Sequence, residues 1–98
     1  MQDYRKLRVW QKAHSFTVNL YKISNNFPSE EKYGLTNQIR RATVSIESNI
    51  AEGCGRDSDN EFRRFLDIAQ GSCYEVIAGA IRLAKRVGSL QAASNLYS

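Results

Sequence analysis

Residues 59–87 read DNEFRRFLDIAQGSCYEVIAGAIRLAKRV, and apolar or small residues recur in this stretch at alternating intervals of four and three. Because an α-helix turns once every 3.6 residues or so, this spacing places them on one face as a continuous seam. Ser58 followed by Glu61 matches the S-x-x-E capping box, which predicts a helix start near Asp59. The sequence therefore predicts a long amphipathic helix over about 59–87, with a seam made of Phe62, Leu66, Ala69, Cys73, Val76, Ala80, Leu83 and Val87.

A second apolar stripe lies beside this seam, at Phe65, Ile68, Ile77 and Ile81. A helix with two apolar faces has to bury both of them. The stripe therefore predicts a neighbour in addition to the helix that packs on the seam.

The preceding sequence contains two further helical patterns. In the first, over about 7–27, apolar residues run from Val9 to Phe27 with the same spacing, and Phe27-Pro28 is expected to end the helix. The second, over about 35–53, has a seam from Leu35 to Gly53 that includes Asn49. Either Gly53 or Gly55 is expected to end this helix in the left-handed cap conformation.

The ten residues after Gly88, SLQAASNLYS, are compatible with a helix but short for an isolated one. They predict a short fourth helix at about 90–97, and the sequence contains no convincing strand. The expected fold is all-α: a single domain over 1–98 that forms an up-and-down antiparallel helical bundle, with three long helices and a short or truncated fourth.

The composition is that of a water-soluble globular chain. Fourteen Lys and Arg against ten Asp and Glu give a net charge of +4, which favours polyanionic partners such as RNA or DNA. No stretch approaches the roughly 18 apolar residues of a membrane span, and the basic N-terminus has no apolar signal region. We therefore expect a cytoplasmic protein with no membrane association, in which Cys54 and Cys73 are reduced thiols.

The chain resembles the four-helix-bundle family of 23S rRNA-intervening sequence proteins. The resemblance rests on LRVWQKAHSF at 7–16, FPSEEKYGLTNQIRRATVSIESNIAEGCGR at 27–56 and EFRRFLDIAQGSCYEV at 61–76. A related branch is the accessory variability determinant of diversity-generating retroelements, a pentameric basic barrel that binds nucleic acid and a reverse transcriptase. The resemblance implies a homo-oligomer, with a pentamer, nucleic acid and a reverse transcriptase as candidate partners. Glu47 stands where the family commonly has proline, so a helix kink there is expected to be absent.

Arginine pairs are the sharpest candidate functional residues, because guanidinium groups bind phosphate in a bidentate manner. Adjacent residues on a helix point about 100° apart, so one arginine of each pair is expected to face solvent while the other lines a subunit contact. A basic N-terminal segment (Arg5, Lys6, Arg8 and Lys12) and a basic cluster at Arg82, Lys85 and Arg86 extend the set. The predicted nucleic-acid-binding residues are Arg40, Arg41, Arg63, Arg64, Lys12 and Lys85.

Other polar and aromatic residues favour structural roles. Asn49 is expected to fix helix register, and Glu52 to pair with Arg56 at i+4. Trp10 and Tyr4 could stack on bases, although packing of Trp10 on a neighbouring helix is the preferred interpretation.

Enzyme function is not expected, and no metal or cofactor is predicted. The single histidine, His14, and the absence of a Glu-x-x-His motif argue against a di-iron bundle site. Arg8 and His14 resemble the loose Arg-x(4–6)-His motif of HEPN ribonucleases, which leaves a remote alternative with His14 as general acid-base. A second alternative is a structural or protein-interaction bundle that uses the stripe containing Ile77 and Ile81.

Overall fold

The computed structural model describes residues 3–27, 29–31 and 34–97, with side chains up to Arg86. Three α-helices make up most of it: α1 (Arg8–Ser24), α2 (Leu35–Cys54) and α3 (Asp59–Tyr97). Short 3-10 turns, η1 (Tyr4–Lys6) and η2 (Ser29–Glu31), precede α1 and α2. The described part of the chain contains no strand, so the prediction of an all-α fold is confirmed.

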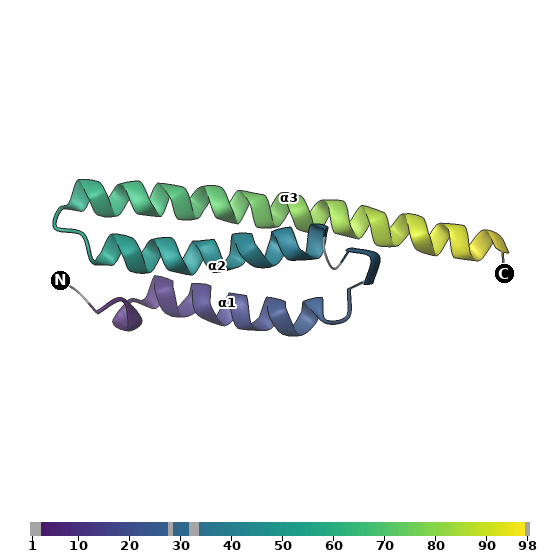
Figure 1. Ribbon diagram of the computed structural model, residues 1–98, viewed down its shortest axis with the longest axis horizontal. Coiled ribbons are helices and arrows are strands. Elements are labelled where there is room, and N and C mark those ends of the chain that lie inside the picture. Colours follow the sequence, from purple (N-terminus) through teal and green to yellow (C-terminus); the bar gives the residue numbers. More distant parts are fainter. Residues whose placement is uncertain (1–2, 28, 32–33, 98) are drawn as a thin grey trace.

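The central helix is α2, against which both α1 and α3 pack (Figure 1). Followed by colour, consecutive helices run in opposite directions along the long axis (Figure 1). The molecule measures 60 × 21 × 19 Å, and its length comes from α3, whose C-terminal part projects beyond the ends of α1 and α2.

A separate fourth helix is not present among the described residues, because α3 continues as one helix to Tyr97. The predictions of a break after Gly88 and of a separate short helix at 90–97 are therefore wrong. A glycine inside a helix costs only about 1 kcal/mol relative to alanine and does not by itself end it. No proline follows Gly88, and no glycine in the described residues has a positive φ.

The end of α1 also differs from the prediction, since the helix stops at Ser24 rather than near Phe27. The amides of Asn26 and Phe27 donate to the carbonyls of Ile23 and Ser24 at 3.0 and 3.1 Å. These i→i−3 bonds tighten the last turn and satisfy carbonyls that the helix would otherwise leave unpaired.

Gly53 lies inside α2 and does not form the expected left-handed cap. The C-cap residue is Gly55, with φ −85° and ψ 0°, a right-handed conformation. A Cβ on Gly53 would lie 2.8 Å from Cβ of Phe65 and 2.9 Å from Cδ1 of Phe62. Gly53 is therefore needed for the close approach of α2 to α3 rather than for a turn.

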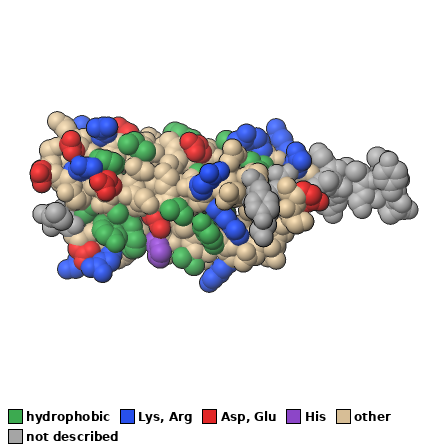
Figure 2. Space-filling model, viewed as in Figure 1, with side chains coloured by type: hydrophobic (Ala, Val, Ile, Leu, Met, Phe, Trp, Pro, Cys, Tyr) green, Lys and Arg blue, Asp and Glu red, His purple; other side chains and the backbone are tan. Residues whose placement is uncertain are grey.

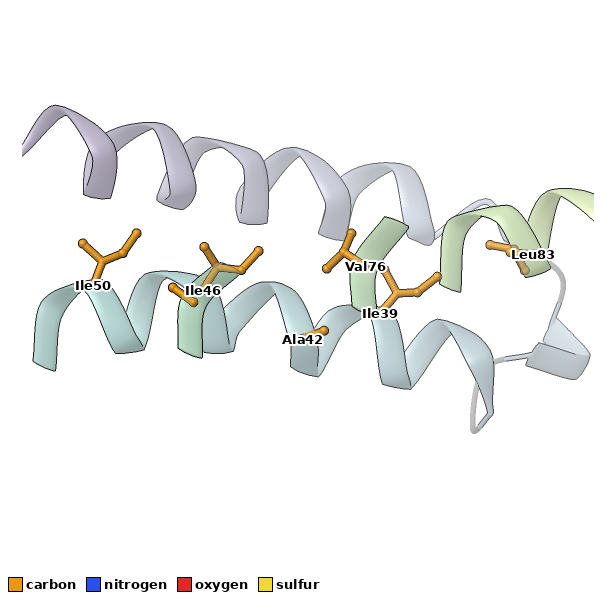
Figure 3. Close-up of a cluster of buried hydrophobic side chains, with 7 residues drawn as sticks. Ile39, Ala42, Ile46, Ile50, Val76 and Leu83 are labelled. Carbon is orange, nitrogen blue, oxygen red and sulfur yellow. The ribbon is translucent and has the colours of Figure 1, made fainter. Parts of the chain in front are cut away.

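The buried residues of the hydrophobic core come from α2 and α3, and Ile46 and Ile50 of α2 point toward α1 (Figure 3). The core follows the two predicted seams except at Ile50, which is buried where the α2 seam predicted Asn49, and consists of Ile39, Ala42, Ile46, Ile50, Ala69, Val76 and Leu83. The predicted α1 seam is only partly covered: Ala13 and Leu20 pack against the core, whereas Val9, Phe16 and Ile23 stay exposed. The core is thus closed on the α2–α3 side and incomplete on the α1 side.

Polar contacts join α1 to α2. His14 Nδ1 lies 2.8 Å from Oε2 of Glu47, and the hydroxyl of Thr17 donates to the carbonyl of Thr43 at 3.4 Å. Glu47 lies in the middle of α2 and thus contributes a cross-helix contact. Among the described residues, no helix is both long enough and apolar enough to cross a membrane.

Candidate nucleic-acid interface

A groove of about 670 Å³ runs between α2 and α3, and α1 contributes no residue to it. We call it the polar groove. Its small residues leave room between the helices, because they carry short side chains or none: Ala42, Ser45, Gly71 and Ser72. Ser72 donates to the hydroxyl of Ser45 at 2.9 Å, which ties the two walls together. Gly79 allows the close approach, since a Cβ there would lie 2.7 Å from Cγ1 of Ile39.

Two exposed arginines line the polar groove, Arg41 from α2 and Arg82 from α3. The antiparallel register, in which Ile39 lies at Gly79 and Ser45 at Ser72, separates them by about 8 Å along the groove. No ion pair engages either guanidinium within the described part of the chain. Both groups are therefore available to an anion.

Arg64 extends this basic surface toward the start of α3. It precedes Ile68 and Gly71, which line the polar groove, by four and seven residues, so all three lie on one helix face. From Arg64 to Arg82 the helix covers about 27 Å. We call Arg64, Arg41 and Arg82 the arginine stripe.

The polar groove also contains groups that are not basic. Glu75 lies on its α3 wall and subtracts from its positive potential, while Gln38 adds an amide that can donate to a phosphate oxygen. The sequence analysis assigned Arg82 to a basic cluster on the third helical pattern but did not pair it with Arg41. The signal was present in the spacing of 64, 68, 71, 75 and 82, which is the helical spacing of one face.

Arg40 points to a different environment from Arg41. Its Nε donates to the hydroxyl of Ser24 at 2.7 Å, and a terminal nitrogen donates to Asn25 Oδ1 at 3.1 Å. Its guanidinium carbon also lies 4.9 Å from the centre of the Tyr21 ring. Arg40 is thus a clamp between α2 and the end of α1 within one chain, and the subunit contact expected for one member of the pair stays a prediction.

The remaining predicted residues lie away from the polar groove. Arg63 is on the α3 face of Leu66 and Gln70, which line a second groove together with Lys12 of α1. Lys85 is exposed on α3 beyond Leu83. The structure therefore brings Arg41 and Arg64 onto one surface and leaves Arg63, Lys12 and Lys85 elsewhere.

The basic N-terminal segment is partly neutralised by its own acid. Arg5 Nε lies 3.1 Å from Oδ1 of Asp3, and the Arg5 amide donates to the same oxygen at 3.1 Å. The side-chain hydrogen bond from Arg5 is the main cause of a lowered pKa at the Asp3 carboxyl. This segment therefore offers less positive charge than its sequence suggests.

The polar residues at the end of α2 form a structural network. Asn49 donates to the carbonyl and hydroxyl of Ser45 at 2.8 and 3.0 Å, and Ser72 of α3 donates to that same hydroxyl. The predicted i,i+4 pair is confirmed, with Arg56 2.6 Å from Glu52 Oε1. The guanidinium carbon of Arg56 also lies 4.8 Å from the centre of the Phe65 ring.

The aromatic side chains near the N-terminus contact one another. Trp10 stacks on His14 with ring centres 4.9 Å apart and meets Tyr4 edge-on at 5.0 Å, and it packs against the core. The histidine is visible on the molecular surface (Figure 2). Arg8 lies six residues before His14, so the two point about 120° apart around α1 and do not meet within one chain.

No group of three or more potential metal ligands occurs in the described residues, and Cys54 and Cys73 form no disulfide.

The chain matches the model of the 23S rRNA-intervening sequence protein family over residues 5–97. It belongs to this family. The helical structure agrees with membership of the 23S rRNA-intervening sequence proteins, as predicted from the sequence. No curated protein matches the chain.

Proposed function

We propose that this protein is a non-enzymatic, cytoplasmic, homo-oligomeric helical bundle that binds the phosphates of RNA or DNA along the arginine stripe. The observation that carries the proposal is the pairing of Arg41 and Arg82 on a groove whose small residues leave room for a phosphate backbone. Guanidinium groups bind phosphate oxygens in pairs and release counterions from a polyanion.

Several features support this proposal. The net charge is +4, and the three arginines of the stripe come from two helices that the core holds in fixed register. In an oligomer the stripe would repeat on each copy, so that modest affinity per copy sums to a larger one. A pentamer and a reverse-transcriptase partner, which the family resemblance implies, belong to the same proposal.

The test is a fluorescence-anisotropy titration of labelled single-stranded RNA and duplex DNA with the full chain and with Arg41→Glu/Arg82→Glu. We expect the double variant to bind about tenfold or more weakly. We also expect the slope of log K against log salt to fall by about one to two units, because two phosphate contacts are lost.

The control is Lys22→Glu, which makes one such charge reversal where the double variant makes two, and which lies on α1, away from the polar groove. It should change affinity less than threefold or so, through net charge alone. Equal losses in the control and the double variant would contradict a localised site. Undiminished binding by a folded double variant would contradict the arginine stripe.

A protein-interaction function is the second candidate, and a specific observation favours it. The predicted second stripe is divided, because Ile68 lines the polar groove, whereas Ile77 and Ile81 lie on another face of α3 and are 55% and 52% exposed. Exposed apolar residues that are contiguous mark interaction surfaces in soluble proteins. If this function is the correct one, nucleic acid will not bind at physiological salt, whereas Ile77→Asp will disrupt an assembly.

A further inference from the structure

Glu75 is an acidic residue in a groove that otherwise suits anions, and it lies close to Arg41. By the register already described for the polar groove, the two residues are at nearly the same level, about 2 Å apart along the groove. Both side chains are exposed, and no ion pair joins them within the described part of the chain. A guanidinium, which only donates, and a carboxylate, which only accepts, thus line opposite walls at one level of the groove.

Glu75 opposes phosphate binding unless the ligand also offers it a hydrogen-bond donor. A carboxylate that loses its water without gaining a donor is costly to bury, whereas a hydrogen bond to a carboxylate is stronger than one between neutral groups. This level of the groove therefore suits a ligand that carries a phosphate oxygen for Arg41 and, next to it, a donor for Glu75.

A ribonucleotide has these two groups side by side. Its 2′-hydroxyl, which donates as well as accepts, is on the sugar carbon next to the one that carries the 3′-phosphate. A deoxyribonucleotide has the phosphate but lacks the hydroxyl, so Glu75 would be left beside a phosphate with no donor. Arg41 and Glu75 together thus distinguish RNA from DNA by the sugar rather than by the base sequence.

Gly71 lies where a strand can approach α3 closely. It lines the polar groove one turn before Glu75, is exposed, and has nothing within 4 Å of the position that a Cβ would take. Packing within the chain therefore does not require glycine here, although glycine is unfavourable in a helix interior relative to alanine. The missing side chain instead lets the backbone of a ligand come near the helix.

Arg82 is placed for a second phosphate of the same strand. It lies about 8 Å from Arg41 along the groove, which is of the order of the distance between neighbouring phosphates in an extended strand. The two walls belong to helices that approach closely at Gly79. Because packed helices have axes about 8–10 Å apart, the groove between them has room for one sugar–phosphate backbone.

We propose that the polar groove binds a single strand of RNA in preference to DNA. Arg41 binds a phosphate, Glu75 accepts the hydrogen bond of the adjacent 2′-hydroxyl, and the strand passes over Gly71. This inference rests on the proposed function, whose phosphate site it uses, and it names RNA as the ligand. It holds for any number of copies, because both side chains come from one chain.

The test is a set of anisotropy titrations of the full chain with labelled oligouridylate, oligodeoxyuridylate and 2′-fluoro oligouridylate of equal length. All three have the same base and charge, and the 2′-fluoro group removes the donor while keeping an RNA-like sugar conformation. We expect RNA to bind about tenfold more tightly than either of the others, since they lack a hydrogen bond to a charged group. Equal binding of RNA and DNA, or of RNA and its 2′-fluoro analogue, would overturn the proposal.

Glu75→Ala tests the assigned residue. It should tighten DNA binding, because a negative charge beside the phosphate is removed, and should reduce the preference for RNA to about twofold or less. The matched control is Asp67→Ala, which makes the same charge change at an exposed position of α3 that is not among the lining residues of either groove. It should leave the preference in place. A preference that survives Glu75→Ala, or that both variants remove equally, would overturn the role of Glu75.

Gly71→Ala should move stability and binding in opposite directions. The added methyl favours the helix but lies in the path of the strand, so we expect a higher unfolding temperature and an RNA affinity about tenfold lower. Undiminished RNA binding would overturn this path.

The failure of this inference can be distinguished from the failure of the proposed function. If RNA and DNA bind equally, and both are weakened by salt and by Arg41→Glu/Arg82→Glu, the phosphate site stands and the preference for RNA is refuted. If neither nucleic acid binds, the proposed function fails together with the inference.

Discussion

Arg40 and Arg41 are neighbours in the chain but have different surroundings. Arg40 holds Ser24 and Asn25 at the end of α1, whereas Arg41 lines the polar groove. The difference follows from the roughly 100° rotation between adjacent residues of a helix. Two adjacent arginines in a helical sequence therefore have separate surroundings and separate roles once the helix has packed.

We expect Arg40→Ala to lower the free energy of unfolding by about 1–2 kcal/mol, because it removes two hydrogen bonds between α1 and α2. Arg41→Ala should change it by less than about 0.5 kcal/mol, since an exposed side chain is removed. Urea unfolding followed by circular dichroism measures both. Equal losses for the two variants would contradict the clamp assigned to Arg40.

Replacing glycine by alanine should change the stability of the protein in opposite directions at two positions. Gly53→Ala should destabilise the protein by about 1–3 kcal/mol, because the new Cβ would collide with Phe65 and Phe62. Gly71→Ala should stabilise it by about 0.5–1 kcal/mol, since nothing lies within 4 Å of the added Cβ and alanine favours the helix. Thermal unfolding of the two variants should shift in opposite directions; a stabilised Gly53→Ala would refute the close approach.

At the scale of elements, α3 has a well-defined beginning and an unusual length. Ser58 accepts a hydrogen bond from the amide of Glu61 at 3.2 Å, as the capping box predicts. The continuation of α3 to Tyr97 was not predicted, because Gly88 reads locally as a stop. The capping signal is local and decisive, whereas a glycine is compatible with both a helix interior and a helix end.

Removing the cap should have a measurable cost. Ser58→Ala should lower stability by about 1 kcal/mol, because the Glu61 amide loses its acceptor. Ser48→Ala, at an exposed position inside α2, is the control and should leave stability unchanged or raise it slightly. Urea midpoints compare the two, and equal effects would show that Ser58 does not act as a cap.

At the scale of the whole molecule, burial is distributed unevenly. The buried residues of α2 include Ile39, Thr43 and Ile50, whereas α1 buries only Thr17 and Ser24. α2 is thus covered by both of its neighbours, while α1 contacts the rest of the fold along one edge. We therefore expect α2 to have a higher local stability than α1.

Hydrogen exchange followed by mass spectrometry should therefore show the slowest amides in α2 and in residues 62–83 of α3. Amides of α1 should exchange faster, because fewer buried contacts hold that helix. Slowest exchange in α1 would contradict this distribution of the core.

The sequence by itself determined the helical class, the seams of α2 and α3, the Ser58 cap and the Glu52–Arg56 pair. All of these depend on residues within about two helical turns of one another, where spacing alone decides which side chains meet. Only the tertiary structure decided that Arg41 shares a groove with Arg82 while Arg40 joins α1, and that Gly53 is a contact rather than a cap. The same holds for the groove between α1 and α3, where Phe16 and Ile77 stay exposed. These features depend on the rotation and register of helices distant in the chain, which are set by how side chains from both helices fill the space between them.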